Sequence, residues 1–488
     1  MLYMPKDGHM WDTSIVYHEN KYYLFSMFRY HGGKDLHVWC AVSEDGVHFQ
    51  DVGAVITDTK PVWKMFVHRF GDTFVMNNGS FSGKPGHEND TLRFHTSKDL
   101  IHWDFCGEDM DSHPDPRWYR EEQRWDHMYT VDYEGKYYGF VVATPKPETD
   151  SFGCGMMVSV DGLKWEALPP VKIDWGDETP VNFEVGGCEK LGDKYYLIGG
   201  LPRVAGNEGY SIIALEADSP LGTFRPLKDG MIIYGTSHGN RYHGVSWLAS
   251  FARGEKDELL LTNYVTAQKI EELCFIGLHQ NVWFLPIKKP FVDTSGKFRL
   301  GYWKKNDLLK GTDITPCDLR ETFLLSSKSD SYALFSRASS EKMLTQIPDC
   351  GVFIEGTAVV RSDGRIPYER FGFAFKGDGD IRTVTVQGGN PKYTHAQIED
   401  WKADTDSREI IDVVEPYTAG KTNFIPEIPF TFKLLCHADI FELYIDDVFV
   451  QTYHTPDHVK YVSLYLENAE AQITSLQIYE MMLEGICL

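Results

Sequence analysis

Along the first 290 residues, short apolar and aromatic stretches alternate with polar turns in a unit that repeats. Each copy places a polar turn before a pair of strand-forming residues, and the copies span residues 19–24, 71–75, 135–138 and 192–197, with a degenerate fifth at 255–259. Short strands repeated at this scale, with almost no helical periodicity, are typical of propeller blades. The pattern therefore predicts five blades between the N-terminus and about residue 290.

A second repeated element predicts a hairpin within each unit. The sequence Ser-x-Asp-(Gly/Leu)-x-x-aromatic occurs at residues 43–49, 97–103 and 159–165, and a looser copy ends at Phe224. Asp followed by Gly between apolar runs favours a tight turn, because glycine accepts a positive φ and aspartate hydrogen-bonds the local backbone. Together the two elements align the units with one another.

The hydrophobic pattern changes after residue 286. Lys-rich turns and Pro290 follow, and later strands show a different alternation, as in residues 371–375 and 441–450. Alternating strands joined by tight turns favour a two-sheet sandwich. The predicted fold is therefore all-β, a five-bladed β-propeller over residues 1–290, a linker packed on it over 291–326 and a C-terminal β-sandwich over 327–488.

Composition narrows the class of protein. The 488 residues suit two hydrophobic cores, and the formal charge of −23 disfavours nucleic acid and membrane surfaces as partners. None of the nine cysteines forms a CxxC pair or a zinc-finger spacing, which is typical of a reducing compartment. Because the sequence has neither an apolar leader nor a membrane-spanning run, we expect a cytoplasmic protein.

Three carboxylates occupy nearly the same place in the repeat, ahead of the aromatic pair. They are Asp12 in unit one, Asp126 in unit three and Glu184 in unit four, while Trp63 and His243 stand near this point in units two and five. The first strand of each propeller blade lines the central channel, so we expect these side chains to converge at its mouth. Close carboxylates raise one another's pKa, and a carboxylate beside a carboxylic acid is what glycoside cleavage requires.

Each acid alone is also explained as a turn or cap residue, but the matching register of all three favours a shared site. The candidate substrate-binding residues are the residues beside these acids or at the same point of the repeat: Trp11, Trp63, Arg124, Trp125, His127 and His243. Aromatic rings stack on sugars, although core packing explains each tryptophan equally well. His238 and His243 lack an evident third ligand, so we expect no catalytic metal and no cofactor.

The order Asp, Asp, Glu at the starts of units one, three and four resembles glycoside hydrolase families 32, 68 and 43. Family 32 joins its propeller to a C-terminal sandwich, and residues 432–447 are similar to the signature of that sandwich. The resemblance covers nearly the whole chain. It implies that Asp12 is the nucleophile, Glu184 the general acid/base and Asp126 the transition-state stabiliser.

Three departures from family 32 fall beside the acids. The usual Asn-Asp-Pro-Asn reads Trp-Asp-Thr-Ser at 11–14, Arg-Asp-Pro reads Arg-Trp-Asp-His at 124–127, and Glu-Cys reads Glu-Val at 184–185. The acids remain, but residues that would grip fructose are altered.

The sequence therefore predicts a glycosidase that acts on a small furanoside oligosaccharide, fructofuranoside-like by resemblance. An inverting arabinofuranosidase is an alternative, because family 43 inverts where family 32 retains. Two further alternatives are an inactive glycan-binding propeller protein and a glycosyltransferase or phosphorylase that uses the same site. A phosphorylase needs a cationic phosphate site, for which Arg124 and His127 are the only candidates.

Overall fold

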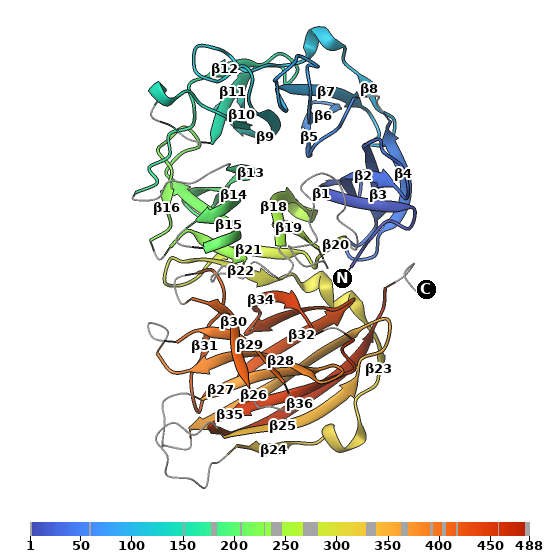
Figure 1. The fold of residues 1–488 in the computed structure, drawn as a ribbon, viewed down its shortest axis with the longest axis vertical. Coiled ribbons are helices and arrows are strands. Elements are labelled where there is room, and N and C mark those ends of the chain that lie inside the picture. Colours follow the sequence, from blue (N-terminus) through green and yellow to red (C-terminus); the bar gives the residue numbers. More distant parts are fainter. Residues whose placement is uncertain are drawn as a thin grey trace.

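The structure, a computed structural model, consists of β-strands and short 3₁₀ helices in the part of the chain that it describes. The described residues are 2–57, 60–149, 151, 153–176, 183–204, 207–228, 230–235, 246–266, 282–327, 338–362, 369–390, 394–402, 407–415, 418–456 and 458–483. The prediction of an all-β protein is confirmed. A ring of small sheets lies above a pair of large sheets (Figure 1). Among the described residues, no helix has the length and apolar character needed to cross a membrane.

Four separate antiparallel sheets form blades of the ring. Blade 1 contains β1 (Gly8–His18), β2 (Lys21–Tyr30), β3 (His37–Ser43) and β4 (Gln50–Ile56). Blade 2 contains β5 (Met65–Phe70), β6 (Thr73–Ser80), β7 (Thr91–Ser97) and β8 (Asp104–Phe105). Blade 3 contains β9 (Trp125–Tyr133), β10 (Lys136–Ala143), β11 (Cys154–Ser159) and β12 (Glu166–Leu168). Blade 4 contains β13 (Glu184–Leu191), β14 (Lys194–Val204), β15 (Asn207–Ala217), β16 (Arg225–Pro226) and β17 (Ile232–Gly235).

The first strands of the blades contact one another around the centre of the ring. β1 contacts β5, β5 contacts β9, and β9 contacts β13. β18 (Ser246–Arg253) contacts both β13 and β1 and so closes the ring. The inner strands thus form a closed circle, the arrangement that brings the starts of distant strands together.

The prediction of five blades is confirmed for four of them. In place of a fifth separate sheet, β18, β19 (Leu259–Thr266) and β20 (Val282–Phe284) belong to a twelve-stranded sheet. The reason is strand pairing: β19 pairs with β21 (Lys288–Val292), β21 pairs with β22 (Phe298–Tyr302), and β22 pairs with a C-terminal strand. The sheet therefore continues beyond β19, where a separate fifth blade would end.

The repeated Ser-x-Asp element forms the same turn in blades 1, 2 and 3, as predicted. In blade 1 the Ser43 hydroxyl accepts the N–H of Gly46 at 2.8 Å, and Asp45 Oδ1 accepts the N–H groups of Val47 and His48. The same bonds occur in the other two copies. The fourth position of the element has a positive φ, which suits Gly46 at 84° and strains Leu100 at 68°.

Two large sheets form the C-terminal region and enclose one hydrophobic core. The twelve-stranded sheet continues through β34 (Val448–His454), β33 (Ile440–Ile445), β32 (Phe430–His437), β26 (Val352–Ser362), β36 (Ala469–Met481), β23 (Lys310–Asp313) and β24 (Phe323–Ser326). The other sheet contains β25 (Ser339–Gln346), β35 (Tyr461–Glu467), β27 (Arg370–Lys376), β28 (Asp380–Gly388), β29 (Ala396–Lys402), β30 (Arg408–Val414) and β31 (Asn423–Phe424). Alternate side chains of β26 and β32, such as Ile354 and Leu434, share the core with Phe373 of β27 and Val384 of β28. This arrangement is sandwich-like.

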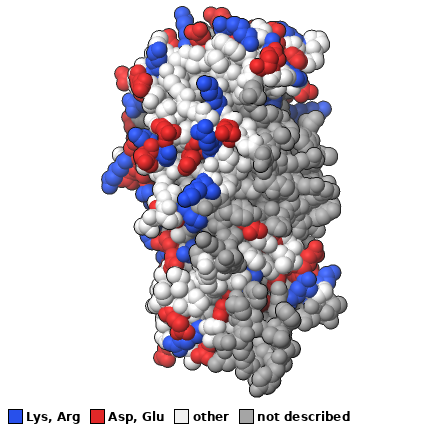
Figure 2. All heavy atoms as spheres, turned by 90° about the vertical axis from the view of Figure 1, so that its left-hand side faces the viewer, with Lys and Arg blue, Asp and Glu red and all other residues white. Residues whose placement is uncertain are grey.

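The 3₁₀ helices among the described residues lie in connections between strands: η1 (Glu108–Met110), η2 (Pro147–Thr149), η3 (Glu255–Asp257), η5 (Lys304–Leu309) and η6 (Cys317–Leu319). On the face shown in Figure 2, acidic and basic side chains of the described residues are interspersed, with no large area of one sign. The described residues of this face therefore do not form a patch suited to a highly charged partner.

A buried ion pair joins the ring to the C-terminal sheets. Lys288 Nζ on β21 lies 2.8 Å from Glu442 Oε2 on β33, and neither side chain is exposed. Lys288 also donates to the Pro286 carbonyl, and Glu442 accepts from the Thr452 hydroxyl at 2.6 Å. Burial lowers the pKa of Lys288, and Glu442 opposes this effect only in part. Each charge depends on the other, because an unpaired buried charge is costly.

We expect Lys288→Met to lower the free energy of unfolding by about 3–5 kcal/mol, because it leaves the Glu442 carboxylate buried without its cation. Urea unfolding measures this loss, and the double variant Lys288→Met/Glu442→Gln should recover a large part of it. Lys304→Met is the matched control, since the Lys304–Asp447 pair is 69% and 39% exposed. A loss at Lys288 as small as that at Lys304 would show that the buried pair does not join the two regions.

Candidate active site

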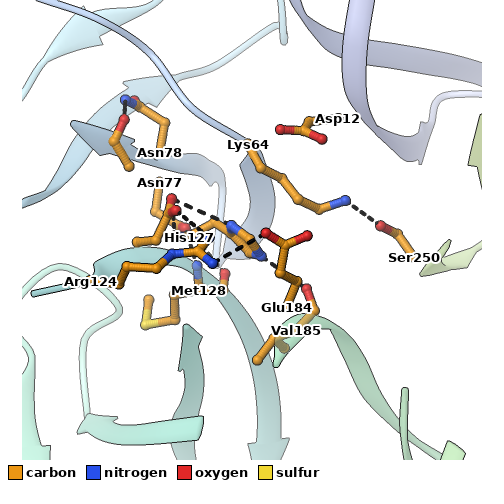
Figure 3. A network of polar contacts seen from close by, with 12 residues as sticks. Asp12, Lys64, Asn77, Asn78, Arg124, His127, Met128, Glu184, Val185 and Ser250 are labelled. Carbon is orange, nitrogen blue, oxygen red and sulfur yellow. Dashed lines mark hydrogen bonds and ion pairs between the residues drawn. The ribbon is translucent and has the colours of Figure 1, made fainter. Parts of the chain in front are cut away.

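The three predicted acids come together at the centre of the ring. Asp12 lies on β1, Asp126 on β9 and Glu184 on β13, the first strands of blades 1, 3 and 4. Asp12 and Glu184 are close enough for the charge of Glu184 to raise the pKa of Asp12. Figure 3 shows Asp12 and Glu184 on either side of the Lys64 side chain, with Arg124 and His127 close to Glu184.

A bulge in β1 presents Asp12 to the centre. The pairing of β1 with β2 shifts register between Trp11 and Ser14, and Asp12 has a φ of 49°. An aspartate tolerates this left-handed conformation better than most residues, and a bulge turns a side chain away from the regular pleat. The Tyr264 hydroxyl on β19 donates to Asp12 Oδ1 at 2.8 Å. The bulge and this bond together set the direction of the carboxylate.

Arg124 links the other two acids. Its Nη2 lies 2.9 Å from Asp126 Oδ2 and its Nη1 lies 3.2 Å from Glu184 Oε1. Burial alone lowers the pKa of Arg124, but the charges of Glu184 and Asp126 outweigh burial and raise it well above its ordinary value. The Tyr210 hydroxyl on β15 donates to Glu184 Oε2 at 2.9 Å. Both oxygens of Glu184 are therefore held, one by a cation and one by a hydroxyl.

Asp126 is buried and held in its ionised form. The backbone N–H of His127 donates to its Oδ1 at 2.8 Å, and Arg124 binds its Oδ2. Burial raises the pKa of Asp126, but the hydrogen bond and charge of His127, together with Arg124, bring it well below its usual value. Gly79 on β6 makes room for this carboxylate, since a Cβ there would lie 2.0 Å from Asp126 Oδ1.

Lys64 is a cation that lies among all three acids. It is fully buried just before β5, and its Nζ donates to the Ser250 hydroxyl at 2.7 Å and to the Thr13 carbonyl at 3.3 Å. Burial lowers the pKa of Lys64 to about 8, although the charges of Asp12, Glu184 and Asp126 each act to raise it. At neutral pH Lys64 is therefore mostly charged and balances part of the negative charge of the acids.

Asp12 differs from Asp126 in its electrostatic environment. Burial raises the pKa of Asp12, and the charge of Glu184 raises it further. Lys64, Tyr264 and His127 act in the opposite direction, without reversing the shift. The site thus contains one carboxylate with a lowered pKa and one with a raised pKa. Environments that separate the pKa values of neighbouring acids are typical of acid/base chemistry.

The structure brings only some of the predicted flanking residues to the acids. Arg124 and His127 contact them directly, and the ring of His127 also donates from Nε2 to the Val185 carbonyl at 3.0 Å. Trp11 is buried beneath Arg29, and Trp63 is partly exposed and packs against Phe81.

Trp125 lies in a separate core between blades 2 and 3, is 0% exposed and does not reach the acids. His238 and His243 lie outside the described residues. No group of three or more His, Cys, Asp or Glu side chains suited to a metal ion occurs in the part of the chain that the structure describes.

The repeat did not reveal Lys64, Tyr210 or Tyr264. Lys64 follows Trp63, the residue aligned with the acids in unit two, so the alignment carried a signal one position away. Tyr210 and Tyr264 come from β15 and β19, strands that are not the first of their sheets and that carry no repeated motif at these positions. Nothing in the sequence singled them out.

Solved structures with the same fold match nearly the whole chain. The glycoside hydrolase family 32 β-fructofuranosidase BmSUC1 of Bombyx mori is 14% identical, with 98% of this chain and 92% of that chain covered and a TM-score of 0.66. Sucrose-6-phosphate hydrolase from Lactobacillus gasseri is 11% identical, with 97% and 91% covered and a TM-score of 0.70. Fructan 1-exohydrolase IIa from Cichorium intybus is 11% identical, with 98% and 96% covered and a TM-score of 0.69.

These similarities confirm the predicted resemblance to family 32 at the level of the fold. No family model matches the sequence, and no curated protein matches it significantly.

We expect Lys64→Met to raise the pKa of Asp12, because the ammonium charge that opposes the effect of burial is removed. Carboxyl-carbon NMR of protein labelled at aspartate measures this pKa directly. Ser250→Ala is the control, since it removes a partner of Lys64 and leaves the charge in place. An unchanged Asp12 pKa in the Lys64→Met protein would mean that Lys64 does not act on this carboxylate.

Proposed function

We propose that this protein is a glycosidase that hydrolyses a small fructofuranoside oligosaccharide with retention of configuration. The observation that carries the proposal is the convergence of Asp12, Asp126 and Glu184 from the first strands of three blades around two cations, the buried Lys64 and the partly buried Arg124. Such a cluster costs stability, since like charges are packed together away from water. Cleavage of a glycosidic bond needs this combination of groups.

In the proposed reaction, Asp12 attacks the anomeric carbon while Glu184 gives its proton to the leaving oxygen. The bond between the anomeric carbon and the leaving oxygen breaks as the bond to Asp12 forms. Glu184 then takes a proton from water, and the water oxygen displaces Asp12 from the sugar. Two displacements at one carbon retain its configuration.

The surroundings of each acid support these roles. Asp126 has a lowered pKa, so it stays ionised and accepts hydrogen bonds from sugar hydroxyls. Lys64 and Tyr264 oppose the raised pKa of Asp12, and a nucleophile must be ionised. Tyr210 orients Glu184 from the side opposite Arg124.

The structural neighbours support a fructofuranoside as the class of substrate. A Bombyx mori β-fructofuranosidase variant was solved with sucrose, and a Cichorium intybus fructan 1-exohydrolase variant was solved with 1-kestose. Their folds match this chain over 98% of its length, which supports a fructofuranosyl group at the acids. The altered residues at 11–14, 124–127 and 184–185 make an arabinofuranoside the alternative to test.

The organisation that we propose follows the repeat. β18, β19 and β20 serve as a fifth blade, supported by the contacts of β18 with β13 and β1. The proposed units are a catalytic propeller over 1–290, a linker over 291–326 and a sandwich over 327–488. A cytoplasmic location is part of the proposal and rests on the scattered cysteines.

We expect Asp12→Ala to abolish turnover of sucrose and 1-kestose, and Glu184→Ala to lower it by about 10²–10⁴-fold. An aryl fructofuranoside with a good leaving group needs little acid assistance, so Glu184→Ala should keep much more activity on it than Asp12→Ala does. Initial rates on these substrates and on aryl arabinofuranosides provide the test.

Asp72→Ala serves as the control, because the Asp72 carboxylate is 96% exposed and lies outside the site. Circular dichroism spectra should match that of the unaltered protein. If all variants are folded and the unaltered protein binds these sugars without turnover, the chain is a glycan-binding protein and the proposed reaction is wrong. Turnover of the arabinofuranoside alone would show that the substrate is an arabinofuranoside and that the proposed fructofuranoside is wrong.

A further inference from the structure

A cavity lies between blades 2 and 3. It has a volume of about 570 Å³. One wall consists of Phe94 on β7 and residues of the segment 109–116, which connects the two blades. The facing wall consists of residues 163–167, at the turn before β12 and in β12 itself. The cavity therefore lies at the junction of two blades.

Trp125 separates this cavity from the central acids. Its indole Nε1–H donates to the Ser112 hydroxyl at 3.0 Å, and Ser112 lines the cavity. Neighbouring residues of a strand point to opposite faces, so Asp126 faces the ring centre when Trp125 faces the core beside the cavity. A ligand in the cavity therefore does not contact the three acids.

Asp111, at the cavity wall, has a carboxylate whose hydrogen-bonding capacity is not satisfied by the described residues. Its side chain is 4% exposed, and its Oδ1 has no hydrogen-bond partner among the described residues. Its Oδ2 lies 3.6 Å from Arg93 Nε, too far for a good hydrogen bond. Burial raises the pKa of Asp111. A buried acceptor left in this state is costly, and a donor from a ligand would relieve the cost.

Trp165 contributes an aromatic surface to the opposite wall. Its Nε1–H donates to the Gly162 carbonyl at 3.1 Å, which fixes the indole within the turn of blade 3. The residue is partly exposed and lines the cavity together with Leu163. A fixed, partly exposed indole offers a flat apolar face at a small cost in conformational entropy.

The chemistry of the walls selects a class of ligand. The cavity is lined by the acidic residues Asp109, Asp111, Asp115 and Glu166. Because carboxylates accept hydrogen bonds, they favour a ligand with several donors, either hydroxyl or ammonium groups. A metal ion is disfavoured, because no suitable group of three or more ligands occurs among the described residues. The indole and the apolar residues favour a ring with a C–H face. A sugar ring has both a C–H face and several hydroxyl donors.

We propose that this cavity is a saccharide-binding site separate from the acids, in which a sugar ring stacks on Trp165 and donates a hydroxyl hydrogen bond to Asp111. Its role is to hold a second part of an oligosaccharide, or a second saccharide molecule, on the outside of the ring. Only the choice of a fructan as the probe rests on the proposed function.

The test uses the Asp12→Ala protein, so that the probe is not consumed, and titrates it with 1-kestose by isothermal calorimetry. We expect a class of binding sites that Trp165→Ala weakens at least about tenfold, the loss of one stacked ring. Asp111→Asn, introduced separately, should weaken the same class. In the otherwise unaltered chain, neither substitution should change sucrose turnover.

Trp103→Ala is the matched control. Trp103 occupies the same position of the repeat in blade 2, and its Nε1–H donates to the Leu100 carbonyl at 3.1 Å, but it does not line the cavity. Titration with an arabinan trisaccharide, and with spermidine as a donor-rich ligand without a ring, completes the design.

Binding that depends on Trp165 and Asp111 but not on Trp103 supports the site. If the arabinan and not 1-kestose binds in this way, the saccharide site stands, and the turnover assays alone decide the proposed fructofuranoside substrate. Binding unaffected by Trp165→Ala, or seen with spermidine alone, overturns the proposal.

Discussion

The structure depends on how a closed ring of strands accommodates charge at its centre. β1, β5, β9, β13 and β18 contact one another in a circle, so polar residues at their starts meet in a confined space. Three carboxylates there would repel one another strongly in surroundings of low dielectric. Arg124 and Lys64 make the cluster tolerable, one by direct contacts with Asp126 and Glu184 and the other by its position among all three acids. The two cations also give the acids different environments.

The backbone adapts to this crowding at a few positions. β1 and β13 both shift register beside their acids, between Trp11 and Ser14 and between Val185 and Gly187. Gly186 allows β13 to approach β18, since a Cβ there would lie 2.0 Å from the Ala249 carbonyl oxygen. These irregularities coincide with the acids because a regular pleat would neither aim the side chains correctly nor let the strands come so close.

Buried charges are also paired with opposite charges where the ring meets the C-terminal sheets. Lys288 and Glu442 are as fully buried as Lys64, yet their partners among the described residues are each other and neutral groups. The Lys288–Glu442 pair has no net charge to offer a substrate. In the central cluster, by contrast, the three acids outnumber the two cations. This difference distinguishes a structural ion pair from a site suited to chemistry.

The sequence alone determined the features that arise from local chemistry. The Ser-x-Asp turns follow from side-chain bonds to nearby backbone N–H groups. The repeated aromatic pairs placed Asp12, Asp126 and Glu184 at nearly the same point of the repeat. The alternation of C-terminal strands likewise predicted two sheets around one core.

Only the tertiary structure decided the partners of these acids and the end of the ring. The Lys64 contact with Ser250 spans 186 residues, and the Tyr264 contact with Asp12 spans 252. The pairing of Gly301 with Val448 joins the last strands of the ring to the C-terminal sheet, where the repeat had predicted a separate fifth blade. Such contacts depend on how distant strands close around a common centre, and no local pattern encodes that closure.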